Sequence, residues 1–288
     1  MTIIVSLRDD FIMLNALIPG FMIPSRRDTT IVNCSFSIVN SRKNNLQKED
    51  FTMSIAENVA RIRAEMEAAA VRCGRGPKEI KLCAATKMND ADAVRQAIAA
   101  GVDCCGENRV QELTAKLAEN AYAGAPVHFI GHLQTNKVKQ VVGKVDLIQS
   151  VDSERLLRAI NAEAARQGIR QDILLEINIG NEESKSGFRP EEVLPLLEKM
   201  GDFSNVCMKG LMAIPPISTF PGENLQYFQK MFQLSVDIRE KINDNVTVDC
   251  LSMGMSDDYM DAIACGSTMI RVGTAIFGAR DYSKLSSN

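Results

Sequence analysis

The stretch that decides the fold runs Met269-Ile270-Arg271-Val272-Gly273-Thr274-Ala275-Ile276-Phe277-Gly278. Its first four residues form a short strand-like apolar run, and a glycine and a threonine then stand where a short helix is predicted to begin. Free N–H groups at a helix start bind phosphate, and parallel α/β barrels often place such a site after their seventh and eighth strands. A plain strand-to-helix turn would have the same pattern. This stretch alone therefore leaves both interpretations open.

Upstream of it, short β-rich runs alternate with amphipathic helical stretches. The predicted strands are 80–85, 103–105, 128–130, 146–149, 173–178, 208–212, 247–252 and 269–272. Parallel strands need long crossovers, usually helical, so about 230 residues with this alternation predict a single-domain (β/α)8 barrel, a TIM barrel of the α/β class. A doubly wound open sheet is the alternative that the periodicity leaves open.

Composition narrows the class of partner. The 288 residues are 45% hydrophobic and 24% charged, with a net charge of -3. Charges of both signs are interspersed, so no basic stripe for nucleic acid is present. The apolar stretch 11–24 is too short and too interrupted to span a membrane. The eight cysteines form no Cys-x-x-Cys pair and most sit in apolar runs, which indicates buried thiols in a reducing, cytoplasmic compartment. Small molecules are the expected partners.

The first fifty residues differ from the rest. Residues 1–52 show no helical or strand periodicity, and we expect them to be a disordered extension or to precede a misassigned start, with Met53 as the natural first residue. Ser54-Ile55-Ala56-Glu57 is a capping box, followed by apolar residues at helical spacing. The predicted barrel domain is therefore 53–288.

Polar residues gather where the predicted strands end. Lys87 follows the first barrel strand, where a lysine shielded from water could act as an amine nucleophile toward an aldehyde. A solvated surface lysine is the alternative. In a barrel these strand ends share one face, so the following loops should converge on one mouth. They contain Thr86-Lys87, Gly106-Glu107-Asn108-Arg109, Gly131-His132-Leu133-Gln134, Ser184-Lys185-Ser186-Gly187, Met253-Gly254-Met255-Ser256-Asp257 and Gly273-Thr274.

From Met53 to Lys284 the chain resembles the pyridoxal phosphate homeostasis protein family, single-domain relatives of the barrel domain of alanine racemase and ornithine decarboxylase (pyridoxal phosphate fold type III). The shared motifs include the loops above and the stretches 128–137, 210–215, 252–258 and 266–280. The resemblance implies that pyridoxal 5′-phosphate forms a Schiff base, the internal aldimine, with Lys87. It further implies that the cofactor is held by Asn108 beside its ring, Arg271 near the pyridine nitrogen, and Ser256, Gly273 and Thr274 at the phosphate.

One position departs from the family. Its members usually have Ser/Thr-Lys-Thr-Lys after the first strand, whereas this chain has Thr86-Lys87-Met88-Asn89. The replacement of the second lysine by Asn89 puts in doubt any role for a second amine in receiving or releasing the cofactor.

His128 and His132 could form a metal pair, but no third ligand of suitable spacing is visible, so we predict structural roles and no metal. Asp257 and Asp258 are expected at a helix start, where acidic residues are favourable.

The same resemblance bears on activity. The racemases and decarboxylases have a second, β-rich domain with catalytic groups, and this chain ends ten residues after Gly278, so we expect no such domain. The sequence therefore favours a monomeric, non-catalytic protein that buffers pyridoxal phosphate or delivers it to apo-enzymes that require it. A weak amino-acid racemase is the alternative, and a barrel that has lost its cofactor is a third. No catalytic residue is predicted.

Overall fold

The computed structural model describes residues 3–7, 10–14, 53–218, 220–241 and 244–278. The chain divides into two compact units, residues 1–49 and residues 50–288. In the first unit, strands β1 (Ile3–Leu7) and β2 (Asp10–Leu14) form a two-stranded antiparallel sheet. The sequence showed no strand periodicity here, so these two strands were not expected. That residues 1–52 form an extension outside the barrel domain stays a prediction. For residues 15–52 the prediction of disorder lies outside the described residues.

The second unit is a closed parallel barrel, which excludes the open doubly wound sheet. Within the described residues its eight strands pair in the order β10-β3-β4-β5-β6-β7-β8-β9, and the pairing of β10 with β3 closes the ring. All eight predicted strands are present, with shifts of a few residues at their ends. They are β3 (Lys81–Ala85), β4 (Cys104–Glu107), β5 (Val127–Phe129), β6 (Leu147–Val151), β7 (Gln171–Ile177), β8 (Val206–Ala213), β9 (Val246–Ser252) and β10 (Met269–Val272).

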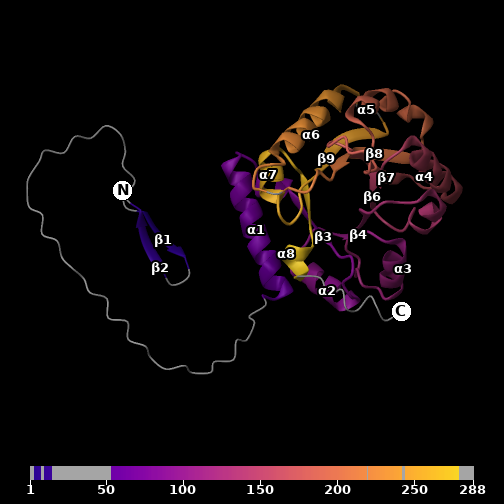
Figure 1. Ribbon diagram of the computed structural model, residues 1–288. Helices are drawn as coiled ribbons and strands as arrows, with labels where there is room; N and C mark the ends of the chain where they lie inside the picture. The colour runs from indigo at the N-terminus through magenta and orange to yellow at the C-terminus, as the bar shows by residue number, and fades with distance from the viewer. Residues whose placement is uncertain (1–2, 8–9, 15–52, 219, 242–243, 279–288) are drawn as a thin grey trace, which may run out of the picture. The chain divides into compact units, whose positions relative to one another are not determined.

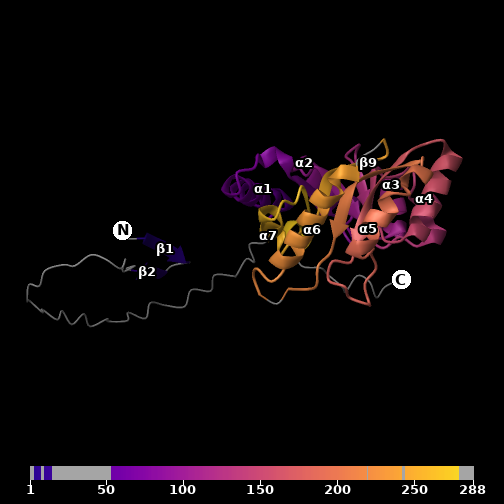
Figure 2. The same cartoon turned by 90° about the horizontal axis from the view of Figure 1, so that it is seen from above.

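Helices surround the strands (Figures 1 and 2). The α-helices are α1 (Ile55–Arg72), α2 (Ala91–Ala99), α3 (Val110–Ala118), α4 (Glu154–Gln167), α5 (Pro190–Leu197), α6 (Leu225–Asp237), α7 (Tyr259–Ala264) and α8 (Thr274–Phe277). In the part of the chain that the structure describes, four 3-10 turns accompany them: η1 (Pro77–Glu79), η2 (Thr135–Gln140), η3 (Met200–Asp202) and η4 (Ile238–Lys241). None of these described helices has the length and hydropathy of a membrane span.

Helix α1 begins where the capping box predicts. The Ser54 hydroxyl accepts from the Glu57 backbone N–H at 3.2 Å, and the Glu57 carboxylate accepts from the Ser54 N–H at 2.7 Å. These bonds satisfy donors that a helix start leaves unpaired. The helix buries Val59, Ile62 and Met66 in an apolar cluster with β3 and β10, and it contacts α2, α7 and α8.

Alternation along each strand separates the core into two parts. On β7, Ile173, Leu175 and Ile177 belong to the large apolar cluster shared with the helices, whereas Leu174 packs with Leu147 and Met212 in a separate cluster. Because successive side chains point to opposite faces of a sheet, the second set lies inside the barrel. Glu176, which follows with the same parity, therefore also faces the interior.

Candidate functional site

Four consecutive strand ends carry the six residues predicted to bind a cofactor. Lys87 follows β3, Asn108 follows β4, Gly273 and Thr274 follow β10, and Ser256 follows β9. Arg271 lies on β10 in register with Cys83 of β3. Since parallel strands in a barrel share one carboxyl end, the structure brings all six residues to adjacent positions at one mouth.

The loop after β3 is held in a tight turn around Lys87. Met88 has a positive φ of 62°, which is uncommon for a residue other than glycine. Its N–H donates to the Glu112 carboxylate at 2.6 Å. The Asn89 side-chain amide donates to the carbonyl of Lys87 at 3.0 Å. Asn89, which stands where the family usually has its second lysine, thus supports the backbone of Lys87.

A buried ionic network lies behind this turn. The Glu107 carboxylate oxygen Oε1 accepts from Lys116 Nζ at 2.6 Å, from the Thr86 hydroxyl at 2.5 Å and from the Tyr122 hydroxyl at 3.2 Å. Lys116 also donates to the Thr86 carbonyl at 2.7 Å. Glu107 and Lys116 are both buried. The network fixes Thr86, the residue directly before Lys87.

The sequence analysis did not predict this network, because Lys116 falls within an amphipathic helix, where a lysine is normally exposed to solvent. One signal could have found it. Glu107 and Asn108 are successive residues at the end of β4, so their side chains point to opposite faces. If Asn108 faces the mouth, Glu107 faces the helices, where a buried carboxylate needs a cation.

Asn108 carries an unmatched polar atom. Its side-chain oxygen Oδ1 is buried and has no hydrogen-bond partner among the described residues. Buried polar atoms are normally paired, so an acceptor of this kind is expected where a bound molecule supplies the donor. Gly131 packs directly against this loop, since a Cβ at Gly131 would lie 2.2 Å from the Asn108 carbonyl oxygen.

Arg271 is buried inside the barrel and contacts polar atoms on β8 and β9. Its guanidinium donates to the Ser252 hydroxyl at 2.5 Å and to the Ala213 carbonyl at 2.9 Å. The Ser252 hydroxyl in turn donates to the Gln149 side chain at 2.7 Å. Burial lowers the pKa of Arg271 below its ordinary value, and Cys83, Glu176 and Asp258 oppose this effect.

Ser256, Gly273 and Thr274 meet at the start of α8. Gly273 is the N-cap of that helix and Thr274 is its first residue. The N–H of Ala275, in the first turn, points to the Ser256 hydroxyl at 3.4 Å. Gly273 approaches β3 closely, because a Cβ there would lie 3.4 Å from the Ala85 Cβ. These three residues offer hydroxyl and backbone donors, the groups that suit a phosphate.

Glu176 is a titratable group of the barrel interior that sequence reasoning did not single out. Burial raises its pKa to about 7, the Asp152 carboxylate adds to this shift, and Arg271 opposes it. A carboxyl group in this range changes charge near neutral pH. Its position within the apolar run 173–178 made it look like an ordinary strand residue.

The two histidines do not form a pair. His128 is buried in the barrel, whereas His132 lies on the exit loop with its Nδ1 3.0 Å from the Asp152 carboxylate. The Ser186 hydroxyl lies 3.5 Å from the same His132 nitrogen. A Ser-His-Asp catalytic triad needs the two partners on different ring nitrogens, so this arrangement is not one.

The acidic pair is placed as expected but acts differently. Asp258 is the N-cap of α7, yet its side chain makes no capping bond and instead accepts from the Met255 N–H at 2.7 Å and the Asn224 amide at 2.8 Å. Asp257 is exposed. The carboxylate of Asp258 therefore tightens the loop that carries Ser256.

Residues 54–281 match the model of the family described as alanine racemase, N-terminal domain. The pyridoxal phosphate homeostasis protein of Pasteurella multocida is 39% identical over 234 residues, which are 81% of this chain and 100% of the relative. That of Escherichia coli strain K12 is 41% identical over 233 residues, 80% of this chain and 98% of the relative. The chain belongs to the pyridoxal phosphate homeostasis protein family.

Solved structures agree with this membership. PipY of Synechococcus elongatus with pyridoxal phosphate bound has a TM-score of 0.68 and 32% identity, covering 78% of this chain and 100% of that one. The match to alanine racemase of Clostridium difficile has a TM-score of 0.62 and 14% identity, and it covers 78% of this chain and 57% of that one. This likeness shows the fold alone. Members of the pyridoxal phosphate homeostasis protein family thus match this chain along nearly their whole length.

Proposed function

We propose that the protein binds pyridoxal 5′-phosphate at the carboxyl ends of β9, β10, β3 and β4 and serves pyridoxal phosphate homeostasis without robust catalysis. The observation that carries the proposal is the convergence of Lys87, Asn108, Arg271 and the Ser256–Thr274 donors on four adjacent strand ends. The names of the relatives and the pyridoxal phosphate bound in PipY support it.

The donor set fits this cofactor. Ser256, Gly273 and Thr274 would bind the phosphate, and the unmatched Asn108 oxygen would face the ring substituents. Lys87 would attach the cofactor covalently through its amine. The Glu107 network supports this role, since it holds Thr86 and so limits where the next side chain can point.

Arg271 argues against extensive reaction chemistry. When bound, pyridoxal phosphate acts as an electron sink for carbanions, and it does so best with a protonated ring nitrogen. Arg271 keeps a guanidinium charge inside the barrel, with hydrogen bonds to Ser252 and Ala213 that fix its position. A cation beside the ring nitrogen disfavours protonation there. This favours holding and release of the cofactor over catalysis.

The decisive experiment compares wild type, Lys87→Ala and Lys144→Ala after incubation with pyridoxal phosphate. Lys144 is an exposed lysine on a loop before β6 and serves as the matched control. We expect a yellow absorption band and, after borohydride reduction, a pyridoxyl adduct on the Lys87 peptide in wild type and in the control. Absence of both from wild type would contradict the proposal, as would an adduct retained by Lys87→Ala.

A second measurement separates a carrier from a weak racemase. Loaded protein is incubated with L-alanine in deuterium oxide, and the α-position is followed by NMR. A carrier should give no exchange above that of free pyridoxal phosphate, whereas sustained enzyme-dependent exchange would establish the racemase alternative.

We also propose that the protein is a monomer that works in the cytoplasm and supplies apo-enzymes. Sedimentation of the loaded protein tests the first point, and transfer of the cofactor to an apo-transaminase tests the last.

A further inference from the structure

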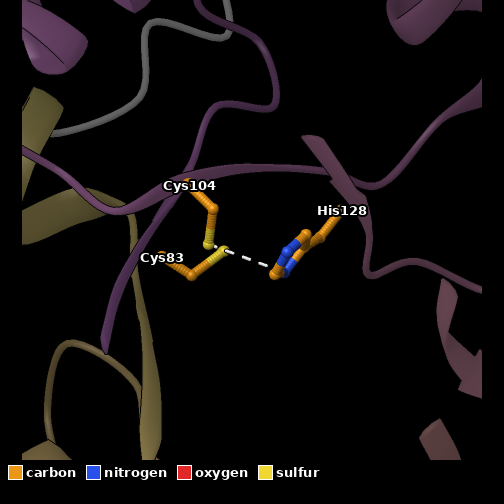
Figure 3. Close-up of side chains that lie close together, drawn as sticks. All are labelled: Cys83, Cys104 and His128. Carbon is orange, nitrogen blue, oxygen red and sulfur yellow. Dashed lines mark hydrogen bonds between the residues drawn. The ribbon is translucent and has the colours of Figure 1, made fainter. Parts of the chain in front are cut away.

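Two thiols and an imidazole meet inside the barrel, next to Arg271, which pairs with Cys83 in the strand register. Cys83 on β3, Cys104 on β4 and His128 on β5 come from consecutive strands, and Cys83 and Cys104 are direct partners in the sheet register. All three side chains are buried. Their sulfur and nitrogen atoms lie within 4.8 Å of one another. Figure 3 shows the three side chains turned toward one another.

We propose that Cys83, Cys104 and His128 form a site for one thiophilic d10 cation, Zn²⁺ or Cu⁺. Two thiolates and a neutral imidazole are ligands that both ions accept. None of the three ligands is among the residues proposed to hold pyridoxal phosphate, and metal binding does not require that cofactor.

The spacing of the ligand atoms suits one ion. A tetrahedral zinc ion binds sulfur at about 2.3 Å and nitrogen at about 2.0–2.1 Å, which sets a sulfur and a nitrogen ligand about 3.5 Å apart. Cys104 Sγ and His128 Nδ1 are 3.5 Å apart. The backbone needs no rearrangement to bring these two ligands to one ion, because both strands are already fixed by the barrel.

The imidazole has the form that a metal ligand needs. The Gln149 side-chain nitrogen lies 2.8 Å from His128 Nδ1, and an amide nitrogen can only donate, so Nδ1 is an acceptor and the ring hydrogen is on Nε2. Nδ1 is therefore unprotonated, and the Cys104 sulfur lies 3.5 Å from the same nitrogen. A bound ion would take the place of the Gln149 donor, which keeps its second contact at 3.2 Å to the Met269 sulfur.

Further sulfur-containing side chains, which are soft metal ligands, surround the proposed site. Met269 is packed against the two thiols, and the partly buried Cys250 adjoins them. The sulfur of Cys83 fills the space above Gly106, since a Cβ there would lie 2.9 Å from it. These contacts hold the thiols toward the imidazole.

Binding requires no redox partner. Each thiol gives its proton to solvent as its sulfur–metal bond forms, so Zn²⁺ with two thiolates is neutral and Cu⁺ with two thiolates carries one negative charge. The buried Arg271 guanidinium, linked to the site through Ser252 and Gln149, would offset the charge in the copper case. The alternative is a thiol pair that is only hydrogen-bonded.

Full-length protein, purified with a phosphine reductant and without added pyridoxal phosphate, is titrated with Zn²⁺ or Cu⁺ against a chelator of known affinity. Bound metal is counted by mass spectrometry of the elements. We expect one equivalent bound by wild type and loss of that equivalent in Cys83→Ser and Cys104→Ser. Cys105→Ser is the matched control, because Cys105 is equally buried but packs on the opposite face of β4, and Cys73→Ser controls for an exposed thiol. Both controls should retain the equivalent.

X-ray absorption of the zinc-loaded wild type gives an answer even if the serine variants fail to fold. A first shell of two sulfurs and one imidazole nitrogen is the expected result. No stoichiometric binding of either ion, binding unchanged in both serine variants, or a shell without two sulfurs would overturn the proposal. Since no step uses pyridoxal phosphate, failure here leaves the proposed function untouched, and failure of that function leaves this result standing.

Discussion

The carboxylate of Glu107 illustrates what a single buried charge determines. It is inaccessible to solvent, and one of its oxygens serves Lys116, Thr86 and Tyr122 together. Because removing one partner leaves the other charge buried and unpaired, we expect Glu107→Gln to lower the free energy of unfolding by about 3–5 kcal/mol. Urea unfolding measures the change. Glu154→Gln breaks a helical ion pair with the exposed Arg158 and should cost under about 1 kcal/mol. Equal losses in the two variants would contradict this prediction.

Glu176 gives the barrel a pH dependence whose sign is fixed. Its pKa is raised from 4.5 to about 7 in the folded state, chiefly by burial. Between these values the unfolded chain has lost the proton while the folded chain keeps it, so the stability that this group contributes is present below pH 4.5 and is lost as the pH rises toward 7. The full loss is about 3 kcal/mol at most.

We therefore expect Glu176→Gln to unfold with a free energy that falls less between about pH 4 and pH 8 than that of wild type. Urea unfolding across this range gives the difference. Glu183→Gln removes an exposed carboxyl from the next loop and corrects for the change of net charge. Parallel profiles for wild type and Glu176→Gln would show that the carboxyl does not titrate as proposed.

Some of the functional residues could be predicted from the sequence and others could not. Lys87, Asn108 and Arg271 could be chosen because whole motifs resemble a family, whereas a lone strand-end lysine would have been ambiguous. The thiol cluster could not be chosen, since Cys83, Cys104 and His128 are far apart in the chain and only the strand register joins them. His128 was considered with His132, which lies elsewhere.

At the scale of elements, Gly131 determines how β5 leaves the barrel beside β4. A Cβ at this position would lie 2.2 Å from the Asn108 carbonyl oxygen and 2.6 Å from its Cα, so backbone must move to accept one. We expect Gly131→Ala to cost about 1–3 kcal/mol of stability and to weaken pyridoxal phosphate binding by displacing Asn108. Thermal unfolding and absorbance titration measure the two effects.

Gly201 provides the comparison. It lies on η3, has no heavy atom within 4 Å of a built Cβ, and should accept alanine within about 0.5 kcal/mol. If Gly131→Ala binds the cofactor as wild type does, the close approach to β4 is not what places Asn108.

The elements themselves were largely predictable from the sequence. Short apolar runs bounded by polar loops predicted every barrel strand, and the capping box predicted the start of α1. The strand ends were less exact, because Glu107 extends β4 and Gln171 begins β7 although both are polar. Glu107 is paired by Lys116 on the following helix, and Gln171 bonds the Gly143 N–H and the Val145 carbonyl from a loop earlier in the chain. A strand pattern does not reveal these partners.

The whole molecule depends on closure of the barrel by β10 and β3, the last and first strands of the ring. Helix α1 covers this seam, with Val59, Ile62 and Met66 in one cluster with Leu82 and Ile270. The helix that precedes the first barrel strand thereby stabilises the strand that carries Arg271. The sequence indicated the helix, but only the closed ring shows why the barrel needs it.

The same reasoning predicts what two truncations do. The family match begins at residue 54, the compact units divide after residue 49, and α1 is capped by its own Ser54. A chain that begins at Met53 should therefore have the thermal unfolding midpoint of the full chain and form the same borohydride-trapped adduct. A chain that begins at Cys73 loses α1, exposes the apolar seam between β10 and β3, and should not fold as a stable barrel. Scanning calorimetry of both separates the cases. A lower midpoint for the first truncation would mean that residues 1–52 do stabilise the barrel, and a stable second truncation would mean that α1 is dispensable for closure.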